Sequence, residues 1–237
     1  MTTKERTQSK RIQTSVLNGA EKKILVWIAK RMPRWVKSDM LTGVGVLGAL
    51  VFALGYFLSN NNILYLWIAN LGLLLNWYGD SLDGSLARVR NTPRPIYGFF
   101  IDHIIDGITI AIMCYGAGLS WLVNMYVSLS VLVVYLLLSI YVYIGAHLKN
   151  EFKLTYAHMG PTEFRAIVFI INIFFMYIPS LREYSRECCI LGRTLNLSVY
   201  DFLLVVIFIV LTVPYICSIV GDAKRYAIED PLPKMKD

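Results

Sequence analysis

Charged residues are scarce in this chain. They make up 16% of its 237 residues, whereas a typical soluble domain has about 25%. Four cysteines are too few for a small disulfide-based scaffold. A disordered chain is also excluded, because disorder requires low hydrophobicity and 56% of these residues are hydrophobic. The composition therefore indicates an integral membrane protein.

Long apolar stretches support this class. A helix needs about 20 mostly apolar residues to cross the hydrocarbon core of a bilayer, and a lipid environment permits only helices or closed barrels. We therefore predict an all-α integral membrane protein with six transmembrane helices. The six stretches are 40–58, 63–77 with a polar end reaching 88, 96–119, 122–145, 166–178 with flanks at 164 and 181, and 199–220. The longest expected outer loop is 181–200.

The segment before the first stretch is amphipathic. Residues 21–37 place Ile24, Leu25, Trp27 and Ile28 at helical spacing, with lysines mostly on the other side. This pattern predicts an amphipathic helix in the membrane interface. The alternative is a helix packed in the core of a soluble subdomain. The expected division of the chain is a polar segment 1–20, an interfacial helix 21–37, a catalytic membrane domain 38–222 and a tail 223–237.

Basic residues predict the orientation. If the N-terminus is cytoplasmic, 20 of the 23 Lys and Arg residues lie on the cytoplasmic side and three lie outside. The positive-inside rule therefore favours both termini in the cytoplasm. The compactness of the chain suggests a bacterial inner membrane. We expect the lipid bilayer, and no nucleic acid, as a partner.

Four aspartates lie near the cytoplasmic ends of two consecutive predicted spans. Asp80 and Asp83 are three residues apart, and Asp102 and Asp106 are four apart. Each pair therefore lies on one helix face. A short loop joins the two helices, so the two acidic faces can meet. Uncompensated carboxylates in a membrane span are costly, and a hard divalent cation such as Mg²⁺ or Mn²⁺ would compensate them.

Four carboxylates are enough ligands for a site with two Mg²⁺ or Mn²⁺ ions, a type of site that catalyses in-line displacement at phosphorus. Gly84 and Gly98 leave room for a phosphate or base beside the acidic faces. Arg88 suits an anionic phosphate. The rival interpretation is a divalent-cation transporter that uses the same aspartates, although transporters usually place such charges near the bilayer midplane.

The stretch from Asp80 to Asp106 reads D-x-x-D-G-x-x-A-R-x9-G-x-x-x-D-x-x-x-D. It resembles the signature of the CDP-alcohol phosphotransferase (CDP-alcohol phosphatidyltransferase) family at every signature position. The start of the first span is similar to the family's T-P-N/D-x-L-T. Asp39, Leu41 and Thr42 match it, whereas Lys37 and Ser38 replace Thr and Pro.

The resemblance implies a reaction and a role for each residue. The donor would be a CDP-linked alcohol, in bacterial branches usually CDP-diacylglycerol, and the acceptor a small polar alcohol, with release of CMP during phospholipid biosynthesis. Members are commonly homodimers. The implied metal ligands are Asp80, Asp83, Asp102 and Asp106, with Asp106 also the catalytic base, and the implied donor-binding residues are Gly84, Ala87, Arg88, Asp39 and Thr42.

The acceptor is less well defined. The segment around Arg165 loosely resembles the start of span five in the phosphatidylinositol-phosphate synthase branch, so Arg165 is the expected acceptor-binding residue, with Lys149 and Lys153 as further candidate cations. Gly145 and His147 depart from that branch, which has Lys and Arg there. We expect inositol or inositol phosphate as the acceptor. Glycerol 3-phosphate and serine are alternatives.

His103 leaves a further alternative. The run from Asp102 to Asp106 reads D-H-x-x-D, which is similar to choline and ethanolamine phosphotransferases. In that branch the acceptor is diacylglycerol and the donor is CDP-choline or CDP-ethanolamine.

Overall fold

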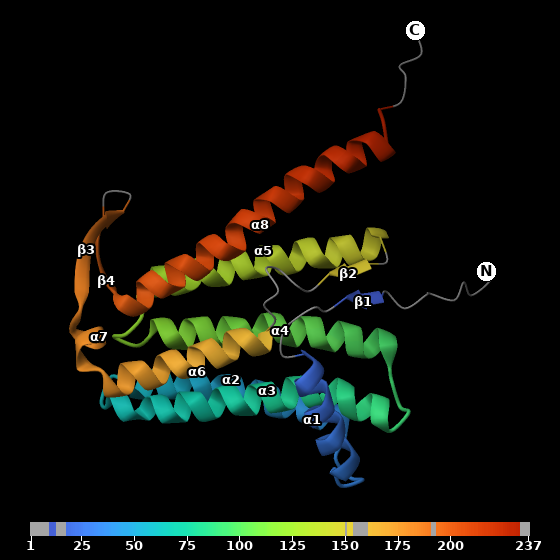
Figure 1. Cartoon of the computed structure of the whole chain (residues 1–237), viewed down its shortest axis with the longest axis horizontal. Helices are drawn as coiled ribbons and strands as arrows, with labels where there is room; N and C mark the ends of the chain where they lie inside the picture. Colours follow the sequence, from blue (N-terminus) through green and yellow to red (C-terminus); the bar gives the residue numbers. More distant parts are fainter. Residues whose placement is uncertain (1–9, 13–17, 150, 154–160, 191–192, 233–237) are drawn as a thin grey trace, which may run out of the picture.

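The structure is a computed structural model that describes residues 10–12, 18–149, 151–153, 161–190 and 193–232. Long helices dominate it (Figure 1). The prediction of an all-α membrane protein is confirmed. In chain order, the long helices are α2 (Ser38–Leu58), α3 (Leu66–Val89), α4 (Pro95–Gly118), α5 (Met125–Lys149), α6 (Pro161–Tyr177) and α8 (Val199–Glu229).

Four of these helices, α2, α4, α5 and α8, are long and apolar enough to cross a membrane. Helix α3 is less apolar because Asn70, Asn76 and the two aspartates interrupt it. Helix α6 has 17 residues and is about 26 Å long, which is shorter than the hydrocarbon core of about 30 Å. The count of six spans therefore stays a prediction.

Helices α2 and α3 pack with their backbones in contact. A Cβ atom on Gly48 would lie 2.3 Å from the Asn76 backbone nitrogen, and one on Gly79 would lie 2.3 Å from the Gly45 backbone nitrogen. A Cβ on Gly72 would likewise lie 2.3 Å from the Phe52 nitrogen. Small residues allow membrane helices to approach this closely. The contact fixes the register of α2 along α3.

The α3–α4 connection brings two helix ends to the same end of the bundle. Helix α3 is followed by Asn91, whose φ of 53° is left-handed, a conformation common just past a helix end. Pro95 then occupies the first turn of α4, where its missing N–H has no intrahelical partner to lose. The two helices run antiparallel (Figure 1).

The main buried apolar cluster includes residues from all six long helices. Phe52, Tyr56 and Phe175 belong to one buried apolar cluster. A buried hydrogen-bond network crosses this cluster. The Tyr56 hydroxyl donates to Asn172 Oδ1 at 2.7 Å and also contacts the Tyr200 hydroxyl, while Asn172 Nδ2 donates to Asn70 Oδ1 at 2.8 Å. Satisfied buried networks favour one specific packing of the helices.

Helix α1 (Asn18–Arg31) lies across the bundle at the end where α3 meets α4 (Figure 1). Leu25 and Ala29 are buried against α3, and Trp27 is 57% exposed. The helix starts three residues before the predicted segment 21–37 and ends six residues before the end of that segment. Pro33, which cannot continue a helix, follows two residues after its last residue.

Short elements complete the fold. The 3₁₀ turn η1 (Ile63–Tyr65) precedes α3, and β1 (Lys10–Ile12) pairs in parallel with β2 (Glu151–Lys153). Part of the predicted outer loop 181–200 forms regular secondary structure instead of a loop. Helix α7 (Pro179–Glu183) leads into the antiparallel strands β3 (Ser185–Ile190) and β4 (Arg193–Ser198), with Ser185 opposite Ser198. In β3, the adjacent Cys188 and Cys189 interrupt the alternation of polar and apolar residues that would predict a strand.

Candidate active site

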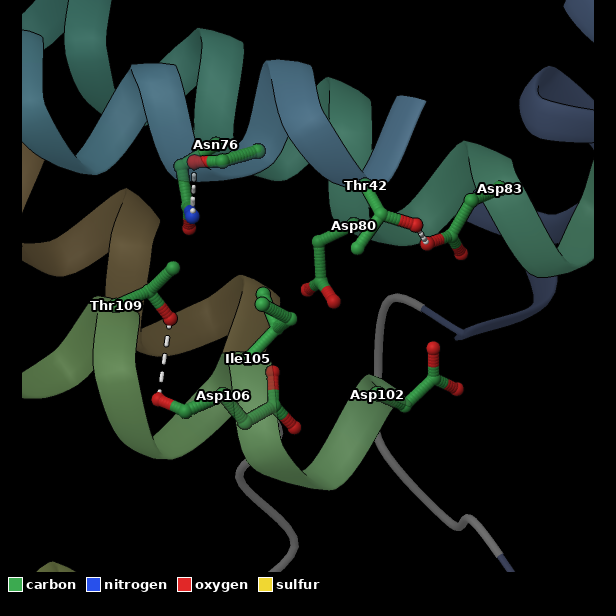
Figure 2. Close-up of a pocket in the computed structure, with 9 residues that line it drawn as sticks. Thr42, Asn76, Asp80, Asp83, Asp102, Ile105, Asp106 and Thr109 are labelled. Carbon is green, nitrogen blue, oxygen red and sulfur yellow. Dashed lines mark hydrogen bonds between the residues drawn. The ribbon is translucent and has the colours of Figure 1, made fainter. Parts of the chain in front are cut away.

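The four aspartates line one cavity. Asp80 and Asp83 come from turns in the C-terminal half of α3, and Asp102 and Asp106 from turns in the N-terminal half of α4 (Figure 2). The antiparallel connection places these turns beside each other, as the spacing predicted. The remaining lining residues are Thr42, Gly45, Asn76, Ile105 and Thr109.

Asp83 is the most firmly held of the four. It is 6% exposed. The Thr42 hydroxyl on α2 donates to Asp83 Oδ2 at 2.7 Å, and the Gly84 backbone N–H donates to Oδ1. The Ser38 hydroxyl donates to the Asp83 backbone oxygen at 2.8 Å. Because both carboxylate oxygens accept a hydrogen bond, this side chain has a fixed orientation.

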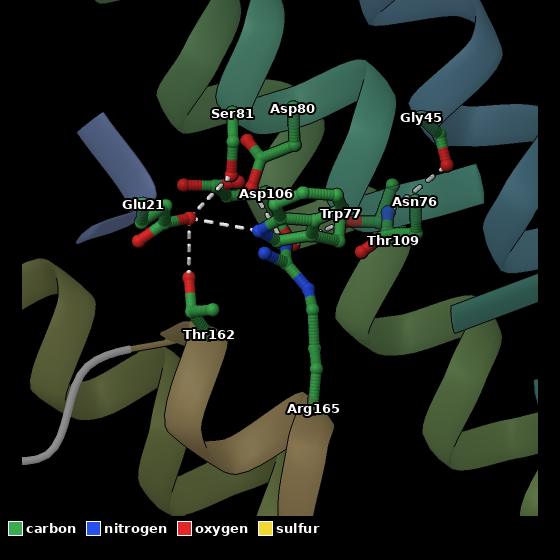
Figure 3. Close-up of polar contacts among 10 residues, drawn as sticks. All are labelled: Glu21, Gly45, Asn76, Trp77, Asp80, Ser81, Asp106, Thr109, Thr162 and Arg165. Atoms are coloured by element: carbon green, nitrogen blue, oxygen red, sulfur yellow. Dashed lines mark hydrogen bonds and ion pairs between the residues drawn. The ribbon is translucent and has the colours of Figure 1, made fainter. Parts of the chain in front are cut away.

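Asp80 is paired with a cation. Arg165 extends from α6 to the acidic cavity, and its Nη2 donates to Asp80 Oδ2 at 2.7 Å (Figure 3). The two side chains are 16% and 35% exposed, respectively. A half-buried ion pair is less screened by solvent than a surface pair. Arg165 thus balances part of the negative charge of the cavity.

The α4 aspartates differ in exposure. Asp102 is exposed, and Asp106 is half-buried. One turn further along α4, the Thr109 hydroxyl donates to the Asp106 backbone oxygen at 3.1 Å. Asp106 therefore sits deeper along the wall that α4 contributes, and Asp102 sits nearer the opening.

The wall between α2 and α3 is built from small and amide side chains. A Cβ on Gly45 would lie 3.4 Å from the Asp80 backbone nitrogen. Asn76 Nδ2 donates to the Gly45 carbonyl at 2.9 Å. These contacts keep α2 against the turn of α3 that carries Asp80.

The other predicted donor-binding residues lie beside the cavity and do not line it. A Cβ on Gly84 would lie 3.4 Å from Arg88 Nη1, and Arg88 Nη2 donates to the Ser85 hydroxyl at 3.1 Å. Ala87 is half-buried. Asp39 forms an exposed ion pair of 3.6 Å with Arg94. These residues surround the end of α3 and the starts of α2 and α4.

The residues that were predicted to contact the acceptor lie in different places. Arg165 reaches the acidic cavity, but it does so as the partner of Asp80. The side chains of Lys149, Lys153 and His147 lie outside the described part of the chain. His103 packs between Phe99 and Tyr143, with ring centroids 4.0 and 4.4 Å away. It is not among the residues that line the cavity.

The chemistry of the cavity fits a hard divalent cation. Four carboxylates from two helices supply the oxygen ligands that Mg²⁺ and Mn²⁺ prefer. Within the described residues, no group of three or more acidic, His or Cys side chains has the geometry of a metal site. In this arrangement Asp80 is hydrogen-bonded to Arg165 and Asp83 to Thr42. The carboxylate oxygens are thus of the type that the predicted metal ions prefer, but they are not arranged as a metal site.

Several residues at or near this site were not predicted. Asn76 precedes Asp80 by four residues and Thr109 follows Asp106 by three, so helical periodicity could have placed both on the acidic faces. Glu21 of α1 accepts hydrogen bonds from α3 and α6 (Figure 3). Its sequence neighbourhood carries no signal of that contact.

Fold and site together define a helical membrane protein with an acidic site between two antiparallel helices. A family model described as CDP-alcohol phosphatidyltransferase matches residues 35–214, which is more than half of the chain. The chain therefore belongs to the CDP-alcohol phosphatidyltransferase family. It is a transferase of phospholipid biosynthesis that acts on a CDP-linked donor and an alcohol acceptor in a membrane. A search of curated proteins found no match.

Proposed function

We propose that this enzyme transfers a phosphatidyl group from CDP-diacylglycerol to a small polar alcohol and releases CMP. One observation carries the proposal: the four aspartates of the family signature surround a single cavity between α3 and α4. The diacylglycerol chains of such a donor would stay in the bilayer, which agrees with a site near the ends of apolar helices.

Asp80, Asp83 and Asp102 are the proposed ligands of two Mg²⁺ or Mn²⁺ ions, with Asp106 also in contact. When bound, such ions neutralise charge on the attacked phosphoryl group and on the leaving CMP. Thr42 and Gly84 hold the Asp83 carboxylate in one orientation. That fixed carboxylate would position the donor's diphosphate with little reorganisation.

Asp106 is the proposed general base. The acceptor hydroxyl gives its proton to the Asp106 carboxylate as its oxygen forms a bond to the β-phosphorus of the donor. The bond between that phosphorus and the oxygen bridging to CMP breaks, and CMP leaves with the bonding electrons. A base must lie within hydrogen-bond reach of the hydroxyl, and the half-buried position of Asp106 on the cavity wall supports this role.

The cytidine-diphosphate part of the donor is proposed to bind around the end of α3. Gly84 and Ala87 offer a shallow surface there. Arg88, Asp39 and Thr42 offer a cation and hydrogen-bonding groups. Arg88 is exposed beside Gly84, a placement that suits a phosphate group.

Arg165 is the proposed acceptor-binding residue, and inositol or inositol phosphate is the favoured acceptor. An anionic acceptor could use the guanidinium once it leaves Asp80. Glycerol 3-phosphate and serine are the alternatives within the same reaction. Transfer to diacylglycerol from CDP-choline or CDP-ethanolamine has less support, because His103 packs against aromatic rings and does not line the cavity.

The membrane arrangement is also part of the proposal. We place all six long helices across a bacterial inner membrane as one catalytic domain, with α1 in the cytoplasmic interface and both termini and the active site cytoplasmic. The charge distribution of the sequence supports this orientation. We also propose a homodimer, by analogy with other family members.

The test is CMP release by the purified protein in detergent with Mg²⁺ or Mn²⁺. One series combines CDP-diacylglycerol with inositol, inositol phosphate, glycerol 3-phosphate or serine. A second series combines CDP-choline or CDP-ethanolamine with diacylglycerol. Release with inositol or inositol phosphate supports the proposal. Release only in the second series overturns it. Metal flux into sealed vesicles without CMP release would instead identify a transporter.

A further inference from the structure

Glu21 on α1 joins three helices through a single carboxylate oxygen. Its Oε1 accepts hydrogen bonds from Trp77 Nε1 at 2.8 Å, from the Ser81 hydroxyl at 3.3 Å and from the Thr162 hydroxyl at 2.8 Å (Figure 3). Trp77 and Ser81 belong to α3, and Thr162 belongs to the first turn of α6. Hydrogen bonds to an ionised acceptor are stronger than those between neutral groups.

These contacts join the same two helices as the Asp80–Arg165 ion pair. Ser81 directly follows Asp80. Thr162 precedes Arg165 by three residues, so the two side chains share a face of α6. The Glu21 bridge therefore lies beside the ion pair and restrains the first turn of α6 relative to α3.

Helix α1 is a firm anchor for this bridge. Leu25 and Ala29 are 6% and 2% exposed and pack with Leu82 and Leu86 of α3. Beyond the end of α1, the Arg90 guanidinium donates to the backbone oxygens of Met32, Pro33, Arg34 and Val36. Both the helix and the segment after it are thus attached to α3. A carboxylate held on such a platform can fix the position of α6.

Glu21 does not line the acidic cavity, so its carboxylate is not placed to bind the ions or the substrates proposed above. We propose that Glu21 is a positioning residue for the transfer reaction. By holding Ser81 and Thr162 together, it sets the placement of Arg165 relative to Asp80 and so the geometry of acceptor binding. This inference rests on the proposed function.

The kinetic test compares Glu21→Ala, Glu21→Gln and Thr162→Val with wild type, using the acceptor that supports CMP release. Glu21→Ala and Thr162→Val should each raise the acceptor KM about tenfold, which corresponds to about 1.4 kcal/mol, and should leave the KM for the CDP-linked donor within about twofold. Glu21→Gln keeps an acceptor oxygen and should restore most of the acceptor affinity. Lys23→Ala, on the exposed face of α1, is the matched control.

The second readout is hydrogen exchange of the metal-free protein in lipid nanodiscs. Glu21→Ala should speed exchange of the amides at 165–168, which bond to the first turn of α6, and combining it with Thr162→Val should add little, because both remove the same bridge. Unchanged exchange, or an equal rise in both KM values, overturns the inference. If no substrate pair releases CMP in wild type, the proposed function fails, and the exchange data alone decide whether Glu21 positions α6.

Discussion

The guanidinium of Arg165 on α6 donates to the carboxylate of Asp80 on α3 across 2.7 Å. Arginine keeps its charge in proteins, so this pair places a permanent cation among four carboxylates. The pair also places α6 against the α3–α4 site, although α6 contributes no residue to the cavity lining. Arg165 would therefore compete with a divalent cation that binds at Asp80.

Replacing Arg165 by Gln should strengthen metal binding. Loss of the guanidinium leaves Asp80 without this counter-charge, so the apparent Kd for Mn²⁺ should fall about tenfold without substrates, as expected for a close charge pair of intermediate exposure. Electron paramagnetic resonance of free Mn²⁺ measures this affinity directly. Arg182→Gln, on α7 at the other end of the bundle, is the control. An unchanged or weaker Mn²⁺ affinity in Arg165→Gln would show that the two cations do not compete.

Replacing Asp106 by Asn should abolish turnover while largely sparing metal-dependent binding of the donor. The amide cannot accept the acceptor's proton, and loss of a general base costs about 10²–10⁴-fold in rate. CMP release measures turnover, and titration with CDP-diacylglycerol in the presence of Mn²⁺ measures donor binding. Asp230→Asn, beyond the end of α8, should behave as wild type. A wild-type rate in Asp106→Asn would refute the base assignment.

Replacing Thr42 by Val should weaken metal binding without unfolding the protein. Valine keeps the shape of threonine but removes the hydroxyl that donates to Asp83 Oδ2. Groups that orient metal ligands typically contribute about 10–100-fold to metal affinity or activity, so the Mn²⁺ concentration for half-maximal rate should rise by at least about tenfold. Thr42→Ser retains the hydroxyl and is the matched control. Equal effects of both substitutions would assign the role to packing.

The acidic site could be predicted from the sequence because it depends on residues that lie close together along the chain. Spacings of three and four residues place Asp80 with Asp83 and Asp102 with Asp106 on helix faces, and the short connection brings those faces together. The family and the type of reaction followed from the same 27-residue stretch and are confirmed. Apolar stretches similarly predicted the helices, since lipid leaves few other structures possible.

Contacts between distant helices could not be predicted in this way. Glu21 and Thr162 are 141 residues apart, and no periodicity relates them. The Asp80–Arg165 pair spans 85 residues and depends on how α6 packs through Asn172 and Phe175. The β3–β4 hairpin is a local feature that was missed: Leu195 and Leu197 alternate with polar residues in β4, but the adjacent Cys188 and Cys189 interrupt the alternation in β3. The two contacts between helices depend on tertiary packing, which a pattern along one segment does not encode.

The close α2–α3 contact makes a final prediction about stability. A Cβ on Gly79 would lie 2.3 Å from the Gly45 nitrogen and 2.4 Å from the Leu41 oxygen. Both are backbone atoms that no side-chain rotation can move, so Gly79→Ala must push the helices apart and disturb the neighbouring Asp80.

We expect Gly79→Ala to lower the free energy of unfolding by about 1–3 kcal/mol, a typical cost of overpacking, and to reduce CMP release. Gly43→Ala is the matched control, because a Cβ there meets nothing within 4 Å, and alanine favours a helix over glycine by about 1 kcal/mol. Thermal unfolding in detergent, followed by loss of helical circular dichroism, compares the two. If Gly79→Ala unfolds at the same temperature as Gly43→Ala, then α2 and α3 are not held at backbone contact, and the register that places Thr42 beside Asp83 must have another origin.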